Sequence, residues 1–504
     1  MQSSRQHKTT SLALALAAVA SWQLQPQGSA AAFFHGATFG AGQFGNPHNR
    51  LNDSASVSSL QMLAAAGANS VAIPIVWYQN ATNSTEVFPM SGDSGSPLRT
   101  VEDFELEAIV QTAHSLNLTT AFQLVVDLNW DRPENLRSFD PLYPGAECLL
   151  YDVKQSLGMP VPPHPPTCPD QATSREYIGC ASAQNCESSF TSEQWRSWFA
   201  SYGAFVDNYA KLAEKLDVDI LGVAYGLTHA SRAPNASEWE DVVAAAKASF
   251  TGKITATAKV TSSENIVDEL DVITWRDSLD FVGVDLEIPL NVSDATTESL
   301  VEAWQPSVNS LKEFSKEAEV PLIISRWGYQ SRISAWEFPQ GAPRDGNGSD
   351  CSVYMRCSSM QDQETAYDAF FDAFAADDGD TSTDWLAGAF MWLWRNDPSQ
   401  GGTSGDDYTP VGKPAFDILR RAWGSKTEGA LSFDSQFNSM ASRSAPDSIT
   451  SQERKHSRNL YKGKQNGICF GIGEWSSTES PSANLNSSEA RQSLRDAAAV
   501  GVNR

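Results

Sequence analysis

The stretch Ser70–Trp77, with the sequence SVAIPIVW, is an almost continuous run of apolar residues. Such a run is typical of a parallel β-strand that is covered on both faces, because neither face then needs polar residues. Further strand-like runs, several of them equally apolar, lie at Ala37–Phe39, Thr120–Leu128, Asp219–Tyr225, Lys253–Val260, Phe281–Ile288, Pro321–Trp327 and Ala387–Trp394. Together they predict eight strands.

Amphipathic segments of helical length separate these strands. They lie at Ser54–Ala66, Val101–Leu116, Thr191–Leu216, Ser237–Phe250, Glu298–Ala318 and Gln361–Ala375. Eight strands that alternate with helices indicate either a (β/α)8 TIM barrel or an unusually large open sheet. We favour the barrel, so the fold class expected for residues 33–424 is α/β.

Two long insertions, at about residues 129–190 and 329–360, interrupt the alternation, each after a strand's C-terminal end, where barrels carry their sites. Six cysteines lie in them: Cys148, Cys168, Cys180, Cys186, Cys351 and Cys357. In an oxidising compartment they would staple both loops with disulfides, in a pairing that the sequence leaves open. A metal site is the weaker alternative, because no CxxC pair occurs and only His164 lies near the first four. We expect no metal and no cofactor.

The N-terminal residues 1–32 have the pattern of a secretory signal peptide. Arg5 and Lys8 form a positive n-region, Ser11–Ala20 is a short apolar core, and small residues around Ser29–Ala32 offer a cleavage site. Glycosylation sequons begin at Asn52, Asn80, Asn83, Asn117, Asn235, Asn291, Asn347 and Asn486. We therefore expect a secreted, extracellular glycoprotein with no membrane segment apart from the signal peptide.

The composition changes after Gly424. Residues 425–466 are rich in Ser, Gln, Lys and Arg without periodicity, which is typical of a disordered linker. Gly467–Trp475 (GICFGIGEW) then matches Gly36–Phe44 (GATFGAGQF). Residues 467–504 are therefore expected to be the truncated start of a second copy of the barrel.

Chemically useful side chains gather at the predicted strand ends. Asp285 and Glu287 share a face by strand alternation, and Asp127 ends another strand. Aromatic rings beside carboxylates suit a sugar, because apolar ring faces stack and hydroxyls take hydrogen bonds. The candidate substrate-binding residues are Trp77, Tyr78, Trp130, Tyr225, Trp327, Tyr329, Trp392, Trp394 and Asp397. His229 is expected to be a hydrogen-bonding residue at the rim.

The partners that this surface suits are uncharged. A net charge of −25 argues against nucleic acid and anionic membranes, which would repel it. A polysaccharide or oligosaccharide is compatible with it. No particular oligomeric state is indicated.

Residues 36–423 resemble the family 113 glycoside hydrolases, which are β-mannanase-type barrels of the large retaining clan A. The most specific carriers are Trp392-Leu-Trp394 with Asp397-Pro398, and the Tyr-Thr-Pro-Val-Gly-Lys-Pro-Ala run at 408–415. Further carriers are the run at 67–79, Val-Asp-Leu at 126–128 and Gly-Val-Asp at 283–285. The resemblance implies an endo-β-mannanase-like barrel that uses two glutamates.

The two family glutamates are replaced in this chain. The family's acid/base follows its fourth strand between Thr and Leu, where this chain has Tyr225-Gly226-Leu227. Its nucleophile lies in the seventh strand shortly before Gly-Tyr, which places Arg326 at that position. Retaining hydrolysis needs two carboxylates about 5–5.5 Å apart. Glycine has no side chain and arginine stays protonated, so neither can do this chemistry.

The leading hypothesis is thus a carbohydrate-binding pseudoenzyme. One alternative is an active glycosidase with displaced carboxylates, Glu287 with Asp127 or Asp285. Another is an accessory barrel in a tandem-domain hydrolase. We also expect the Arg326 guanidinium to reach Glu287 at the barrel mouth, and the pair to neutralise a site that Asp127 and Asp285 leave acidic.

Overall fold

The structure is a computed structural model, and it describes residues 33–40, 49–91, 98–129, 175–180, 186, 189–232, 234–293, 295–339, 358–374, 385–403 and 407–424. The predicted signal peptide, linker and truncated second copy lie outside the described residues.

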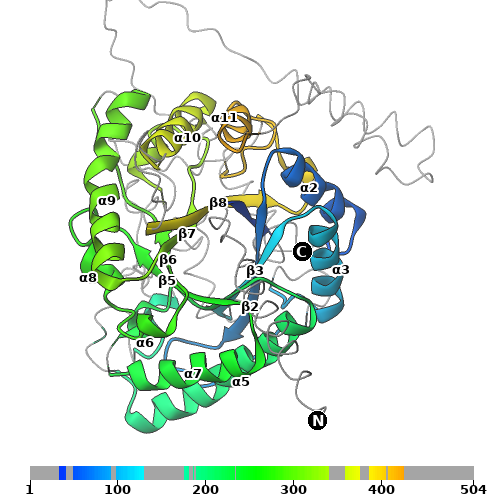
Figure 1. Cartoon of the computed structure of the whole chain (residues 1–504), viewed down its shortest axis with the longest axis vertical. Helices are drawn as coiled ribbons and strands as arrows, with labels where there is room; N and C mark the ends of the chain where they lie inside the picture. Colours follow the sequence, from blue (N-terminus) through cyan, green and yellow to red (C-terminus); the bar gives the residue numbers. More distant parts are fainter. Residues whose placement is uncertain are drawn as a thin grey trace, which may run out of the picture. The chain divides into compact units, whose positions relative to one another are not determined.

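Eight parallel strands form a closed barrel in which each strand pairs with its neighbours in sequence and β8 pairs with β1. The strands are β1 (Phe34–Gly40), β2 (Ser70–Gln79), β3 (Thr119–Leu128), β4 (Ile220–Tyr225), β5 (Lys253–Val260), β6 (Phe281–Leu286), β7 (Leu322–Trp327) and β8 (Leu386–Arg395). Figure 1 shows the strands enclosed by helices. The predicted (β/α)8 barrel is confirmed.

The helices occupy the connections between strands, as the amphipathic segments predict. The longer ones are α2 (Ser54–Ala65), α3 (Asp103–Ser115), α5 (Ser192–Lys215), α7 (Ala236–Ser249), α9 (Thr297–Ala318), α10 (Met360–Phe374) and α11 (Ala415–Ala422). Shorter helical segments are η3 (Arg175–Tyr177), α6 (Thr228–Ser231), α8 (Ile266–Leu270), η4 (Arg276–Ser278), η5 (Ala335–Glu337) and η8 (Pro398–Gln400). Helix α5 begins at a capping box, in which the Thr191 hydroxyl accepts a hydrogen bond from the Gln194 amide.

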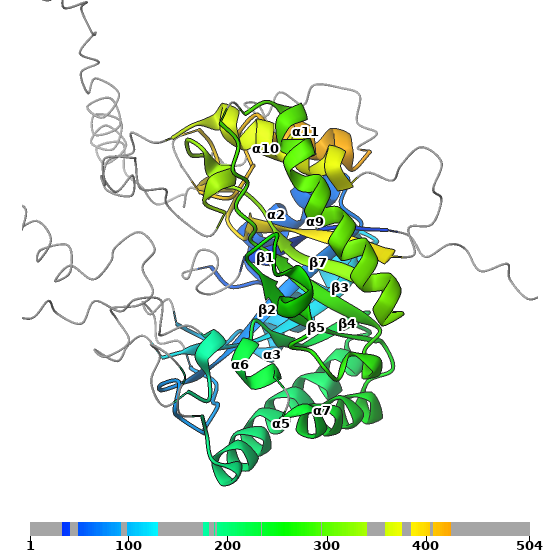
Figure 2. The same ribbon diagram turned by 90° about the vertical axis from the view of Figure 1, so that its left-hand side faces the viewer.

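Aromatic side chains fill the layer between the strands and the neighbouring helices α5 and α7, which lie side by side (Figure 2). Trp198 stacks on Tyr202 with ring centroids 4.6 Å apart, and Trp239 stacks on Trp275 at 4.8 Å. The Tyr202 hydroxyl donates a hydrogen bond to the Val223 carbonyl of β4 at 2.5 Å. This packing fixes α5 against β4, the strand that ends just before Gly226.

An irregularity in β7 controls the direction of its last side chains. Val284 of β6 pairs with Ile324, but the next residue, Asp285, pairs with Arg326, so Ser325 is an extra residue in β7. A β-bulge of this kind changes the face to which the following side chains point. Arg326 consequently lies next to Asp285 on the neighbouring strand.

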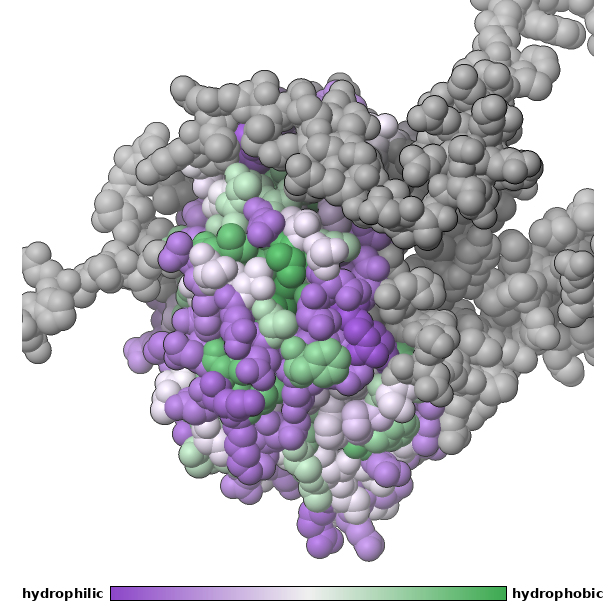
Figure 3. Space-filling view, turned by 90° about the vertical axis from the view of Figure 1, so that its right-hand side faces the viewer, coloured by the Kyte–Doolittle hydropathy of each residue, from purple (hydrophilic) through white to green (hydrophobic). Residues whose placement is uncertain are grey.

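The side of the barrel that carries α2 and α3 in Figure 1 faces the viewer in Figure 3, where apolar residues lie in small groups among hydrophilic ones. Of the helices that the structure describes, none is long and apolar enough to cross a bilayer.

Candidate functional site

Ionisable and polar side chains converge where strands β3 to β7 end. We call Asp127, Tyr225, Lys259, Asp285, Glu287 and Arg326 the mouth cluster. Asp127, Asp285 and Glu287 are only 2–4 % exposed. Lys259 of β5 pairs in register with Asp285 of β6, which in turn pairs with Arg326 of β7. Three consecutive strands therefore present a cation, an anion and a cation side by side.

Arg326 lies between the two acidic residues of the β6 end. Its Nη1 forms ion pairs with the Glu287 carboxylate and with Asp285 Oδ2, the latter at 3.4 Å. Its guanidinium carbon also lies 4.7 Å from the centroid of the Trp392 ring, within the range of a cation–π contact. The predicted contact between Arg326 and Glu287 is confirmed.

Lys259 and Tyr225 complete the connections of the cluster. Lys259 Nζ lies 3.1 Å from Glu287 Oε2, so this carboxylate contacts two cations. The Tyr225 hydroxyl donates a hydrogen bond to Asp285 Oδ2 at 3.2 Å. Buried charges need partners of opposite sign, and both carboxylates have one, whereas Asp285 Oδ1 and Glu287 Oε2 accept no hydrogen bond from the described residues.

Burial and neighbouring charges shift the proton affinities of the cluster. The pKa of Asp285 is raised from 3.8 to about 6, because burial and the Glu287 charge together outweigh the opposing effect of Arg326. Burial alone would lower the pKa of Lys259, but Glu287 and Glu176 together raise it above its ordinary value. The Asp285 carboxyl therefore takes up a proton at a higher pH than an ordinary aspartate does.

The raised pKa of Asp285 predicts a pH-dependent difference between the wild type and the Asp285→Asn variant. Folding favours the protonated carboxyl, so this group's stabilisation is fully present below pH 3.8 and is lost as pH rises through about 6. The shift corresponds to roughly 3 kcal/mol. The variant should therefore gain stability relative to the wild type between pH 4 and pH 8, as measured by urea unfolding at several pH values. A constant difference across this range would contradict the assignment.

A segment from the first long insertion lies against the cluster. Arg175 Nη2 forms an ion pair with Asp127 Oδ2 at 2.9 Å, and the guanidinium carbon lies 5.9 Å from the centroid of the Tyr225 ring. Glu176 Oε1 accepts a hydrogen bond from Lys259 Nζ at 2.7 Å. Helical turn η3 thus supplies one charge of each sign to the mouth.

Gly226, where the sequence resemblance predicts the acid/base glutamate, has a left-handed backbone with φ +64°. A Cβ atom added there would lie 3.5 Å from Cδ and 3.8 Å from Cγ of Arg175, which is ordinary contact. The aliphatic part of Arg175 therefore lies directly in front of this position. A larger residue at 226 would adopt a strained conformation beside a cation.

The structure corrects the placement of three predicted sugar-binding rings. Trp77 stacks on Phe205 of α5 at 4.7 Å, and Trp327 stacks on Phe370 of α10 at 3.7 Å. Trp394 is fully buried and donates a hydrogen bond to the Ser59 carbonyl of α2. These rings point outward from the barrel wall and fill the layer between barrel and helices.

The remaining candidates occupy mixed positions. Tyr78 is buried next to Tyr225 in a small apolar cluster, and Tyr329 is buried in the main core. The Asp397 carboxylate accepts a hydrogen bond from the Ser399 amide at the start of η8. Trp130 lies outside the described residues. Of the aromatic candidates, the structure brings Tyr225 and Trp392 into contact with the charged residues of the mouth.

The different positions of Trp327 and Trp392 predict different effects of their removal. Trp327→Ala would leave a cavity beside Phe370 and should lower the free energy of unfolding by about 3–5 kcal/mol. Trp392 is partly exposed, so Trp392→Ala should cost less than about 2 kcal/mol. Chemical unfolding measures both. Equal costs would mean that Trp327 is not a core residue.

Sequence reasoning missed Lys259, Arg175 and Glu176. Lys259 lies near the end of a correctly predicted strand, so a complete survey of strand ends would have found it. Arg175 and Glu176 lie inside a long insertion that has no periodic pattern. Nothing in the sequence indicates that they contact β3 and β5.

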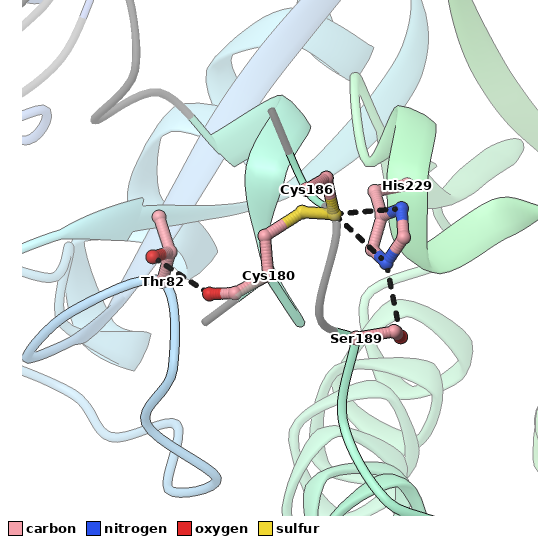
Figure 4. Close-up of a disulfide and its surroundings, with 5 residues drawn as sticks. All are labelled: Thr82, Cys180, Cys186, Ser189 and His229. Atoms are coloured by element: carbon pink, nitrogen blue, oxygen red, sulfur yellow. Dashed lines mark hydrogen bonds between the residues drawn. A yellow bond between two sulfur atoms is a disulfide. The ribbon is translucent and has the colours of Figure 1, made fainter. Parts of the chain in front are cut away.

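One predicted disulfide is present near the mouth, between Cys180 and Cys186. Figure 4 shows the His229 ring beside it: both ring nitrogens lie 3.3 Å from Cys186 Sγ, and Nε2 lies 3.2 Å from Ser189 Oγ. His229 therefore has the predicted rim position. The cysteines at 148, 168, 351 and 357 lie outside the described residues.

Comparison with known proteins gives the same architecture. The sequence model of Glycoside Hydrolase Family 113 matches residues 152–413. A family 113 β-mannanase from Alicyclobacillus acidocaldarius, solved in complex with ManMIm, has a TM-score of 0.55 and 20% identity, over 78% of this chain and 97% of that one. Another structure of a family 113 β-1,4-mannanase has a TM-score of 0.53 and 20% identity, over 78% and 99% of the two chains. No curated protein sequence matches the chain.

Proposed function

This chain belongs to glycoside hydrolase family 113, and we propose that its barrel binds a β-mannan-type polysaccharide without hydrolysing it. The proposal includes secretion, for which the predicted signal peptide and the Cys180–Cys186 disulfide are the support, because disulfides persist in oxidising compartments. The ligand class follows from the β-mannanase names of the structural relatives.

The observation that carries the proposal is the ion-pair arrangement around Arg326. A retaining glycosidase needs a free carboxylate as nucleophile at this position. Here a guanidinium occupies it and pairs with both Asp285 and Glu287. At the other family position, Gly226 offers no side chain and faces the stem of Arg175. Neither the nucleophile position nor the acid/base position therefore carries a carboxylate.

The mouth retains features that suit a neutral sugar. Trp392 is partly exposed, and an aromatic face of this kind can stack on the apolar face of a pyranose ring. The carboxylates around it can accept hydrogen bonds from hydroxyl groups. These features support binding without requiring bond cleavage.

Titration of the full-length protein with β-1,4-mannohexaose by isothermal calorimetry tests glycan binding. We expect saturable binding that weakens at least about tenfold in Trp392→Ala, the loss of one stacked ring. Trp385→Ala is the matched control, because this ring lies in contact with Lys312 on the helix side. No binding by the wild type, or equal weakening by the two variants, would contradict the proposal.

A second candidate, an active hydrolase with displaced carboxylates, is favoured by one observation. Asp285 and Glu287 pair with the same Arg326 guanidinium, and the pKa of Asp285 is raised to about 6, which suits a general acid. On this hypothesis Glu287→Gln abolishes a measurable turnover. Absence of turnover in the wild type removes the candidate.

A further inference from the structure

We propose that the turn Arg175–Tyr177 is an internal occupant of the barrel mouth, and that a glycan reaches the mouth cluster only when this turn is displaced. The inference concerns regulation of the same site and rests on the proposed glycan binding. It starts from the two charged side chains of η3, which contact opposite sides of the cluster.

The charges of the turn match those of the barrel residues that they contact. Arg175 pairs with Asp127 of β3, and Glu176 pairs with Lys259 of β5. Swapping the two charges would create two repulsive contacts, so the turn fits the mouth in one orientation. Each pair includes a group on the strand ends where a sugar would otherwise take its hydrogen bonds.

The turn also fills space. The stem of Arg175 lies in contact distance of the Cβ position of residue 226, and its guanidinium covers the Tyr225 ring. This is the location that the family pattern gives to the acid/base side chain. A sugar unit cannot occupy that location while Arg175 does.

The chain next to the turn is fixed to the barrel frame. Gly179 donates a backbone hydrogen bond to the Thr82 carbonyl at 2.8 Å, and Phe190 donates one to the Gly179 carbonyl at 2.8 Å. The Thr82 hydroxyl donates to the Cys180 carbonyl at 3.2 Å, beside the Cys180–Cys186 disulfide (Figure 4). The turn is thus anchored on one side, while partly exposed ion pairs hold its charged side chains in the mouth.

Both ion pairs are part-buried, with side-chain exposures of 18 and 3 % for Arg175 and Asp127 and of 28 and 20 % for Glu176 and Lys259. A ligand can compete with them only by offering its own hydrogen bonds to Asp127 and Lys259. The competition predicts that removal of the two charges favours glycan binding.

The test compares the wild type with Arg175→Ala/Glu176→Ala in the full-length chain, using β-1,4-mannohexaose and calorimetry. We expect at least tenfold tighter binding by the double variant. The control is Lys211→Ala/Asp207→Ala, which removes an exposed i,i+4 ion pair on α5 and should bind as the wild type does. Unchanged or weaker binding by the mouth variant would overturn the proposal.

Hydrogen exchange of the peptide that contains residues 175–180 tests, without a ligand, whether the turn Arg175–Tyr177 is held in the mouth. The amides of Ile178, Gly179 and Cys180 are hydrogen-bonded, so they should be protected in the wild type. They should exchange at least tenfold faster in the double variant. Unprotected amides in the wild type would overturn the occupant. If protection behaves as expected but neither protein binds the oligosaccharide, the occupant stands and the proposed glycan binding fails.

Discussion

Replacing Arg326 by alanine is expected to lower the free energy of unfolding by about 3–5 kcal/mol at pH 8, because the change leaves two buried carboxylates with too few cations. Lys259 remains beside Glu287, so the loss falls mainly on Asp285. At pH 5 the Asp285 carboxyl can take up a proton, and the cost should be smaller. Urea unfolding at the two pH values measures both.

Two further variants identify the cause of this loss. Arg421→Ala removes an ion pair of 2.8 Å to Asp368 that is largely exposed, and should cost less than about 1 kcal/mol. The triple variant Arg326→Met/Asp285→Asn/Glu287→Gln replaces all three charges with neutral side chains. It should recover most of the stability that Arg326→Ala loses. If Arg326→Ala were as mild as the surface control, Arg326 would not be balancing buried charge.

Restoring the two family glutamates is expected to be insufficient for hydrolysis. In Gly226→Glu/Arg326→Glu, the carboxyl at position 226 would lie beside Arg175, and a neighbouring cation holds the pKa of a carboxyl low. A carboxyl that stays ionised cannot donate the proton that the leaving group requires. The double variant should therefore turn over β-1,4-mannohexaose only at a trace rate.

Adding Arg175→Ala to these two changes removes that cation and opens the space in front of position 226. We expect the triple variant to release reducing ends at least about 100-fold faster than the double variant, the scale of acid/base catalysis. The control triple variant carries Arg196→Ala in place of Arg175→Ala, because Arg196 is an exposed arginine on α5. Equal turnover by the double and triple variants would show that Arg175 does not determine the acid/base environment.

The strands could be predicted because each is a local pattern. Lys253–Val260 was predicted with the bounds that the structure shows, and Ser70–Trp77 was extended by two residues. Strands covered on both faces differ sharply in composition from the connections between them. The barrel then follows from the regular alternation of eight strands with helices, which few other folds accommodate.

The contact of Arg326 with Glu287 was also predictable. Both residues lie at the ends of consecutive parallel strands, and such ends meet at one edge of the sheet. The bulge at Ser325 was not visible in the sequence, yet it brings Arg326 beside Asp285 as well. The contact could therefore be predicted from opposite charges at the ends of neighbouring strands, without knowing which residues pair between β6 and β7.

The sequence could not predict whether a single aromatic side chain points to the barrel mouth or to the surrounding helices. Trp392 and Trp394 are two residues apart, which places them on one face of a regular strand. In β8, however, Met391 pairs with Ala37 and Trp394 pairs with Phe39, so the strand holds an extra residue there. One ring consequently contacts Arg326, and the other is buried against α2.

Release of reducing ends from β-mannan by the full-length wild-type protein tests the central claim most directly. A family member whose Arg326 guanidinium pairs with Asp285 and Glu287 should release none above a boiled control, at neutral pH and at pH 5 alike. Clear release that disappears in Glu287→Gln would contradict this, and would mean that the mouth cluster itself contains a relocated catalytic pair.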